Sequence, residues 1–171
     1  MKYLISFLFL ALAFSMKSEA KVTLPSILGD NMVLQQQAEV KLWGKARPNA
    51  TVTVKTSWNG QTYKFSSDGK GGWSLTVSTP VAGGPYKIIF NDGELLTLQN
   101  VLIGEVWFCS GQSNMEMPMG CFDRQPVRGA NDIIAKAKPS TPIRMYTTDS
   151  KDGRWVRQFS KTPAEDCQGE W

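Results

Sequence analysis

The chain has 171 residues, of which 42% are hydrophobic and 20% are charged, and its formal net charge at pH 7 is +4. The basic residues are scattered and are not interleaved with aromatic residues, which argues against a nucleic-acid partner. The sequence contains no histidine, and its three cysteines lack the close spacing of zinc ligands, so we expect neither a metal site nor a cofactor.

Residues 1–20 have the pattern of a secretory signal peptide. A positively charged start precedes an apolar run from Tyr3 to Phe14. Ser18 and Ala20 are small residues at the minus-three and minus-one positions of a cleavage site. The run is shorter than the ~20 apolar residues that a membrane span needs. We therefore expect a protein exported to the periplasm or the medium, with no membrane attachment after cleavage.

Residues 21–100 have the pattern of a small all-β domain. Short alternating runs are separated by turn-forming sequences at about 8–12 residue spacing, which is typical of a sandwich or barrel. Within the run that starts at Thr51, Val52 and Val54 would face one side of a sheet and Thr51, Thr53 and Lys55 the other. The separating sequences are NGQ at 59–61, SDGKGG at 67–72, PVAGGP at 80–85 and NDG at 91–93.

Three tryptophans in this part of the chain have two interpretations. Trp43 and Trp73 are expected to fill the core between two sheets, although either could instead stack on a sugar ring. Trp58 precedes the Asn59-Gly60 turn, and for this residue core packing and sugar stacking are about equally supported.

Residues 101–171 have a different pattern. Val101 to Cys109 is almost continuously apolar, as expected of a strand buried on both faces of a parallel sheet. Ala130, Ile133, Ile134 and Ala137 form a helical stripe that Pro139 ends, and 142–148 is again strand-like. This order predicts one βαβ unit, the start of an α/β domain. Too few residues follow for a complete sheet, so we expect the chain to be a truncated, N-terminal part of a longer protein.

Ser113 stands where the predicted strand turns toward a helix-like segment. Gly111 can adopt backbone angles that are closed to other residues, and this would allow a sharp turn. A helix N-terminus beside Ser113 would stabilise an oxyanion, as in the strand-to-helix elbow of α/β hydrolases. Local chemistry alone favours the alternative that Ser110 and Ser113 are helix caps or turn residues.

The sequence GEVWFCSGQSNMEM at 104–117 resembles the signature of the sialate O-acetylesterases, which are carbohydrate acetylesterases of the SGNH hydrolase type. The upstream segments LPSILGDNMVLQQ, VKLWGKARPNATVTV, GGWSLTV and GGPYKIIF are similar to the N-terminal β-domain of that family, in order and spacing. The resemblance covers essentially all of residues 22–147. It implies a sandwich-like domain followed by the first part of an α/β, flavodoxin-like SGNH hydrolase domain.

The resemblance implies that Ser113 is the catalytic nucleophile and that its backbone N–H contributes to the oxyanion hole. Gly111, Gln112 and Asn114 would shape the elbow. Glu116 would be a favoured carboxylate in the first helical turn, and a catalytic role for it is a weaker expectation. The implied substrate is O-acetylated sialic acid, with acetylated xylan or another acetylated carbohydrate as the nearest competitor.

The sequence departs from the family pattern because the later blocks that carry the triad are absent. Without histidine, Ser113 has no imidazole to accept its proton, and an unassisted serine is a weak nucleophile. Outside the predicted signal peptide, which contributes the serine of a Ser18–Lys21 match, a Ser-x-x-Lys spacing occurs only at Ser67 and Lys70, in a turn of the first domain, and is expected by chance. We therefore expect this chain alone to be inactive.

Two alternatives of other classes remain. The β-domain could be a non-catalytic carbohydrate-binding or supporting module, and a purely supporting role is favoured over binding. A structural or adhesion sandwich is the other alternative, and the ordered motifs argue against it. The sequence leaves the oligomeric state open. It allows one disulfide, for which Cys121 with Cys167 is the expected pair, while Cys109 is expected to be a buried small hydrophobe.

Overall fold

The computed structural model describes residues 21–111, 115, 117–121, 125–138, 143–148 and 169–170. The predicted signal peptide, residues 1–20, lies outside these ranges. Within them, no helix is both long enough and apolar enough to cross a membrane. The described secondary structure is mostly β-strand, with one short helix, α3 (Ala130–Lys136).

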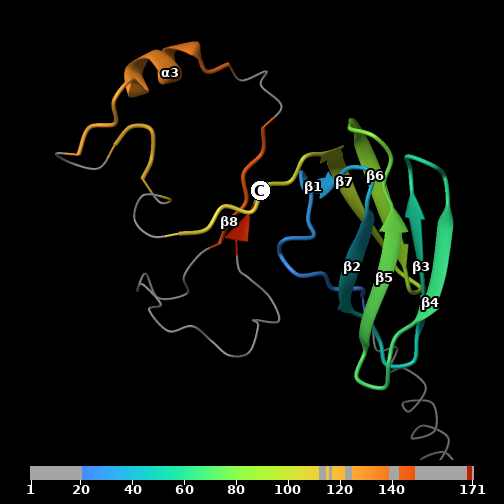
Figure 1. Cartoon of the computed structure of the whole chain (residues 1–171). Helices are drawn as coiled ribbons and strands as arrows, with labels where there is room; N and C mark the ends of the chain where they lie inside the picture. Colours follow the sequence, from blue (N-terminus) through green and yellow to red (C-terminus); the bar gives the residue numbers. More distant parts are fainter. Residues whose placement is uncertain are drawn as a thin grey trace, which may run out of the picture.

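Seven strands between residues 33 and 104 form the first part of the molecule (Figure 1). The strands are β1 (Val33–Gln35), β2 (Glu39–Lys45), β3 (Thr51–Thr56), β4 (Thr62–Ser66), β5 (Gly72–Ser78), β6 (Gly83–Asn91) and β7 (Leu95–Gly104). From β3 onward the strands are separated by the four predicted turn sequences, in agreement with the predicted all-β pattern.

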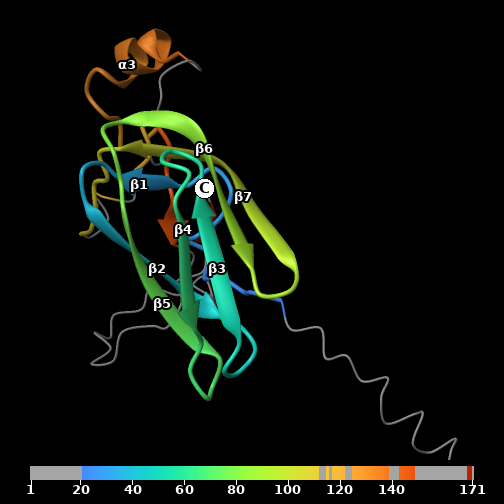
Figure 2. The same ribbon diagram turned by 90° about the vertical axis from the view of Figure 1, so that its right-hand side faces the viewer.

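The strands form two sheets that enclose one core. Five strands are arranged in the order β1-β7-β6-β3-β4, and β2 pairs with β5 in a second sheet. All pairs within these sheets are antiparallel except β1 with β7, which is parallel. Figures 1 and 2 show the β2–β5 pair lying over one face of the larger sheet.

Only two of the four predicted turns close hairpins within one sheet. The turn at Asn59–Gly60 joins the paired strands β3 and β4, and the turn at Asp92–Gly93 joins β6 and β7. The turn at 67–72 leads from β4 to β5, and the turn at 80–85 leads from β5 to β6, so both cross between the sheets. A turn sequence ends a strand, but it does not determine which strand the chain pairs with next.

Apolar residues from both sheets alternate into the core. Val52 and Val54 are fully buried and Thr51 and Lys55 are exposed, which confirms the predicted alternation along β3. Trp73 is buried against Phe65 and Phe90, at ring-centroid distances of 5.1 Å and 5.7 Å. The fully buried side chains of the core include Val22, Met32, Leu42, Val77, Ile88 and Val101.

The other two tryptophans are only half-buried. Trp43 packs against the edge of the core, so its predicted structural role is supported, although it is not a central residue. Trp58 meets Tyr86 edge to face at 5.8 Å, and its indole N–H donates to the Ser78 carbonyl oxygen at 3.1 Å. These contacts use both the ring and its donor within the domain, which favours a packing role for Trp58 over sugar stacking.

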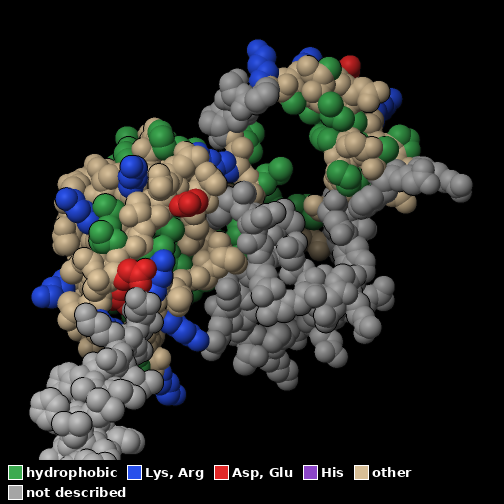
Figure 3. Space-filling model, turned by 180° about the vertical axis from the view of Figure 1, so that it is seen from behind, with side chains coloured by type: hydrophobic (Ala, Val, Ile, Leu, Met, Phe, Trp, Pro, Cys, Tyr) green, Lys and Arg blue, Asp and Glu red, His purple; other side chains and the backbone are tan. Residues whose placement is uncertain are grey.

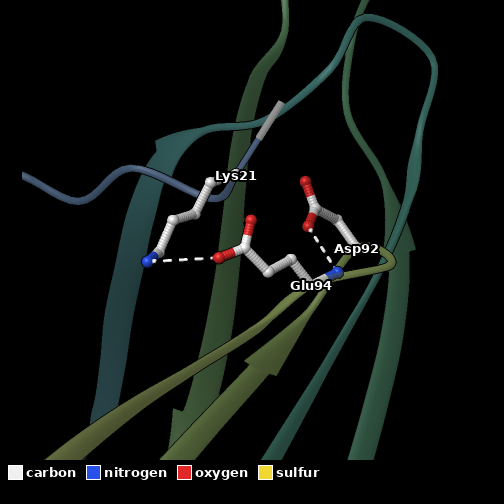
Figure 4. Close-up of polar contacts among 3 residues, drawn as sticks. All are labelled: Lys21, Asp92 and Glu94. Atoms are coloured by element: carbon white, nitrogen blue, oxygen red, sulfur yellow. Dashed lines mark hydrogen bonds and ion pairs between the residues drawn. The ribbon is translucent and has the colours of Figure 1, made fainter. Parts of the chain in front are cut away.

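The β6–β7 turn is held to the start of the described chain by a surface ion pair. Lys21 Nζ lies 3.4 Å from a Glu94 carboxylate oxygen, with both side chains about half exposed (Figure 4). Asp92 is buried in the same turn, and one of its oxygens accepts from the Glu94 backbone N–H at 3.5 Å. Exposed ion pairs contribute at most about 1 kcal/mol, so the Lys21–Glu94 pair adds little to the stability of the turn.

The part of the chain after β7 differs from the predicted βαβ unit. Helix α3 spans Ala130–Lys136 within the predicted helical stripe, which confirms the helix. Strand β8, Thr147–Thr148, falls within the predicted strand at 142–148. However, β8 pairs antiparallel with β9, Gly169–Glu170, and no parallel partner for it is found among the described residues. The βαβ arrangement therefore stays a prediction in its details.

Candidate functional site

The signature at 104–117 begins at Gly104, the last residue of strand β7. At the end of the strand, Gly104 lies opposite Gln35 of β1, and the Gln36 backbone N–H donates to the Gly104 carbonyl oxygen at 2.8 Å. The neighbouring strand β6 reaches only as far as Ile103. Neither neighbour continues beyond Gly104, so the chain leaves the larger sheet there.

Two glutamines of the β-domain hold the first residue after β7. Gln35 and Gln36 donate from their side-chain amides to the two carboxylate oxygens of Glu105, at 3.2 Å and 2.6 Å. Their amide oxygens accept from backbone N–H groups, Gln35 from Val106 at 2.9 Å and Gln36 from Ala82 at 2.8 Å. Each amide thus has its donor and its acceptor in use, and these bonds link the residues that follow β7 to the end of β1.

These bonds lower the pKa of the Glu105 carboxyl. The hydrogen bond from Gln36 is the larger cause, followed by the bond from Gln35, because both stabilise the ionised form. A lowered pKa means that the interaction is present above the ordinary pKa of glutamate. It is lost as the pH falls through the lowered value.

We expect the substitution Gln36→Ala to raise the pKa of Glu105 more than Gln35→Ala does, because the Gln36 bond is the larger cause. The measurement is a titration of the Glu105 carboxyl carbon by NMR in the two variants and the unsubstituted chain. Gln37→Ala is the matched control, since no hydrogen bond links the Gln37 side chain to Glu105. An unchanged pKa in Gln36→Ala would contradict the described geometry.

The predicted buried strand at 101–109 is only partly correct. Val101 and Ile103 are buried within β7, but the strand ends at Gly104 and the next residues are exposed. Trp107 and Phe108 are 82% and 94% exposed. The pattern of 101–109 predicts one strand, whereas only residues 101–104 belong to β7 and complete the sandwich. No strand pairs with the second part of this run among the described residues.

Gly111 meets a steric constraint of a different kind from the one predicted. Its φ lies outside the left-handed region, so the turn does not depend on angles that only glycine tolerates. A Cβ at this position would lie 2.5 Å from Met115 Cγ, far inside normal contact distance. Gly111 therefore allows the Met115 side chain to approach the backbone closely, and any other residue would displace Met115.

The other predicted site residues are Gln112, Ser113, Asn114 and Glu116, and they lie outside the described residues. Their roles stay predictions. Sequence analysis also missed the glutamine pair that fixes Glu105, because a polar run after an apolar strand resembles an ordinary surface turn. The available signal was the LPSILGDNMVLQQ segment, whose similarity to the family extends to these glutamines.

A shallow hollow of about 360 Å³ lies beside α3. Its lining is mixed, and no cluster of three His, Cys, Asp or Glu side chains suited to a metal ion occurs in the described part of the chain. The hollow is lined by Met119, Gly120, Cys121, Pro126, Val127, Gly129, Ala130, Asn131 and Asp132.

The structure places two of the three cysteines. Cys109 is exposed, so the prediction of a buried small hydrophobe is wrong, because the chain has already left the sheet at this position. Cys121 is half-buried in the hollow beside α3. Cys167 lies outside the described residues, and its pairing with Cys121 stays a prediction.

Comparison with known proteins confirms the resemblance inferred from the motifs. The chain is 34% identical over 105 residues to sialate O-acetylesterases of Homo sapiens and Pongo abelii, and 34% identical over 102 residues to that of Mus musculus. Each alignment covers 54% of this chain. It covers 20% of the human and orangutan proteins and 19% of the mouse protein. The chain therefore spans about a fifth of the length of these curated relatives. No protein-family model matches the chain.

A solved structure supports the same relationship. A carbohydrate acetylesterase from Xanthomonas citri superposes with a TM-score of 0.72 and is 30% identical. The similarity covers 88% of this chain and 32% of that protein. The mostly β architecture described above is therefore similar to part of a carbohydrate acetylesterase.

Proposed function

We propose that this chain is the N-terminal part of an exported carbohydrate O-acetylesterase in which Ser113 is the nucleophile. The observation that carries the proposal is the similarity to sialate O-acetylesterases and to the bacterial carbohydrate acetylesterase. The GQSN sequence at 111–114 provides the serine. The signal-peptide pattern of residues 1–20 supports export.

The proposed reaction is an acyl transfer in two steps. The Ser113 hydroxyl attacks the acetyl carbonyl carbon, a bond forms from Oγ to that carbon, and the bond to the sugar oxygen breaks. A general base takes the serine proton and passes it to the sugar oxygen, which leaves as an alcohol. Water then hydrolyses the acetyl-enzyme and releases acetate. Because these 171 residues contain no histidine, the proposal needs a base from outside them.

The β-domain would support this site without binding the sugar itself. The hydrogen bonds from the two glutamines to Glu105 link the start of the 104–117 signature to the β-domain. Trp58 has its ring and its N–H engaged within the domain. These contacts favour the supporting role over a separate carbohydrate-binding function.

The proposed substrate is an O-acetylated sialic acid, with acetylated xylan as the second candidate. The test is acetate release by the full-length protein from O-acetylated sialic acid, acetylated xylan and a simple acetyl ester. We expect hydrolysis of the simple ester and of one of the two carbohydrates. Incubation with a fluorophosphonate, followed by peptide mass spectrometry, should place the label on Ser113. Absence of hydrolysis on all three substrates, or a label on another serine, would overturn the proposal.

A further inference from the structure

Strand β7 contains a bulge at Gln99 and Asn100. Leu98 lies opposite Ile88 of β6 and Val101 lies opposite Tyr86, so β7 has one more residue than β6 in this interval. Asn100 adopts left-handed backbone angles, with φ of 56°. A bulge of this kind leaves backbone groups out of the ladder and redirects them. The Asn100 carbonyl oxygen is thus free to accept from a group outside the sheet.

The turn before β1 packs against this bulge and orders it. Asn31, also left-handed with φ of 66°, donates its backbone N–H to the Gln99 carbonyl oxygen at 3.1 Å. Gln99 donates its own backbone N–H to an Asp30 carboxylate oxygen at 2.7 Å. The Asn100 side-chain amide donates to the Asn31 side-chain oxygen at 2.7 Å. These bonds all lie within the β-domain, so the arrangement does not depend on the rest of the chain.

Three oxygens of this arrangement converge on one side chain from the second half of the chain. Arg144 Nη1 donates to the Asn31 carbonyl oxygen at 2.8 Å and also to the Asn100 carbonyl oxygen. Its Nη2 donates to the Asn100 side-chain oxygen at 2.9 Å. The planar guanidinium suits this set because its N–H groups point in fixed directions, which a lysine ammonium cannot reproduce.

The side chains of residues 143–146 alternate between exposed and half-buried. Tyr146, two positions later, shares a 2.6 Å hydrogen bond with the Ser26 hydroxyl of the β-domain. Ile143 and Met145 are 74% and 77% exposed. In an extended segment, alternate side chains point to opposite sides. Arg144 and Tyr146 therefore attach this segment to the sandwich, and its apolar side chains face away from it.

We propose that Arg144 is a positioning residue that anchors the segment 143–148 to the β-domain, in a socket preformed by Asn31 and Asn100. The socket consists of neutral oxygens, so its recognition rests on geometry and not on a charge pair. The β-domain thereby fixes where the chain runs after α3, as the glutamine pair fixes where it runs after β7. The anchor goes beyond the proposed esterase function and does not depend on it.

Trypsin cleavage of the peptide bond after Arg144 tests the anchor directly. A guanidinium held in the socket cannot enter the specificity pocket of trypsin. Cleavage at Arg144–Met145 should therefore be slower than at Arg128–Gly129, where Arg128 is exposed. The substitution Asn100→Gly removes one acceptor of Arg144 and also the side-chain donor to Asn31, while it allows left-handed angles. It should accelerate cleavage at Arg144–Met145 at least roughly three- to tenfold, the effect of losing one hydrogen bond to the guanidinium. Peptide mass spectrometry over a time course measures both sites in one sample.

Asn49→Gly is the matched control, since Asn49 is left-handed, with φ of 56°, in the turn between β2 and β3. It should leave both cleavage rates unchanged. Tyr146→Phe, which removes the bond to Ser26, should also accelerate cleavage at Arg144. The anchor is refuted if Arg144–Met145 is cut as fast as Arg128–Gly129, or if Asn100→Gly does not change its rate. The readout uses no substrate, so it stands whether or not the esterase proposal holds.

Discussion

Replacing Ser113 by alanine is expected to abolish acetyl-ester hydrolysis by the full-length protein, with a loss in kcat/KM of at least about 10³-fold. The hydroxyl is the atom that forms the acetyl-enzyme, and alanine offers no substitute for it. Binding of the carbohydrate does not need this oxygen, so KM should change much less than kcat. Steady-state kinetics with a simple acetyl ester and with the preferred carbohydrate would measure both constants.

Ser110→Ala is the matched control for this prediction. Ser110 lies three positions upstream, its side chain is exposed, and the resemblance to the family assigns it no role. Its replacement should leave kcat/KM within a factor of about two, because an exposed substitution of this kind changes little. Activity that survives Ser113→Ala and disappears in Ser110→Ala would transfer the nucleophile to Ser110. Activity that survives in both variants would exclude both serines as the nucleophile.

Replacing Phe90 by alanine is expected to destabilise the β-sandwich by about 3–5 kcal/mol. Phe90 is fully buried near the end of β6, between Val54 of β3 on one side and Leu96 of β7 on the other, and its ring contacts Trp73. Truncation leaves a cavity that the two rigid sheets cannot close. A loss of this size approaches the whole stability of a small domain, about 5–15 kcal/mol. Urea unfolding followed by tryptophan fluorescence would measure the shift in midpoint.

Leu95→Ala serves as the control for the core substitution. Leu95 lies on the neighbouring strand β7 but is 64% exposed, so its side chain has little apolar contact to lose. We expect a change below about 0.5 kcal/mol. Equal destabilisation by the two substitutions would show that Phe90 does not occupy the described core.

Local pattern was enough to predict several elements of this protein. The alternation of Val52 and Val54 with polar neighbours identified β3 and its buried face, because side chains along a strand alternate between the two faces of the sheet. The stripe that begins at Ala130 identified α3, because apolar side chains three and four positions apart share one face of a helix. The GQSN sequence indicated the family, and the comparisons confirmed that resemblance.

Pairing and anchoring could not be read from local pattern. The apolar run from Val101 predicts the start of a new sheet, but its first residues complete β7. Val101 pairs with Tyr86 of β6, and Ile103 pairs with Leu34 of β1. The sequence predicts that Gly111 supplies backbone angles closed to other residues, but its φ lies outside the left-handed region. The constraint at this position is the close approach of Met115, which depends on side-chain placement that no spacing reveals.

Residues that are neighbours along the chain predict the strands from β3 to β8, the helix α3 and Ser113 as the candidate nucleophile. Which strands share a sheet, and how the later segments attach to the sandwich, depends on contacts between residues far apart in the chain. Gln36 and Glu105 are separated by 69 positions, and Arg144 and Asn31 by 113. Such contacts form only when the folded chain brings distant polar groups within hydrogen-bond distance, and no periodicity in the sequence records them.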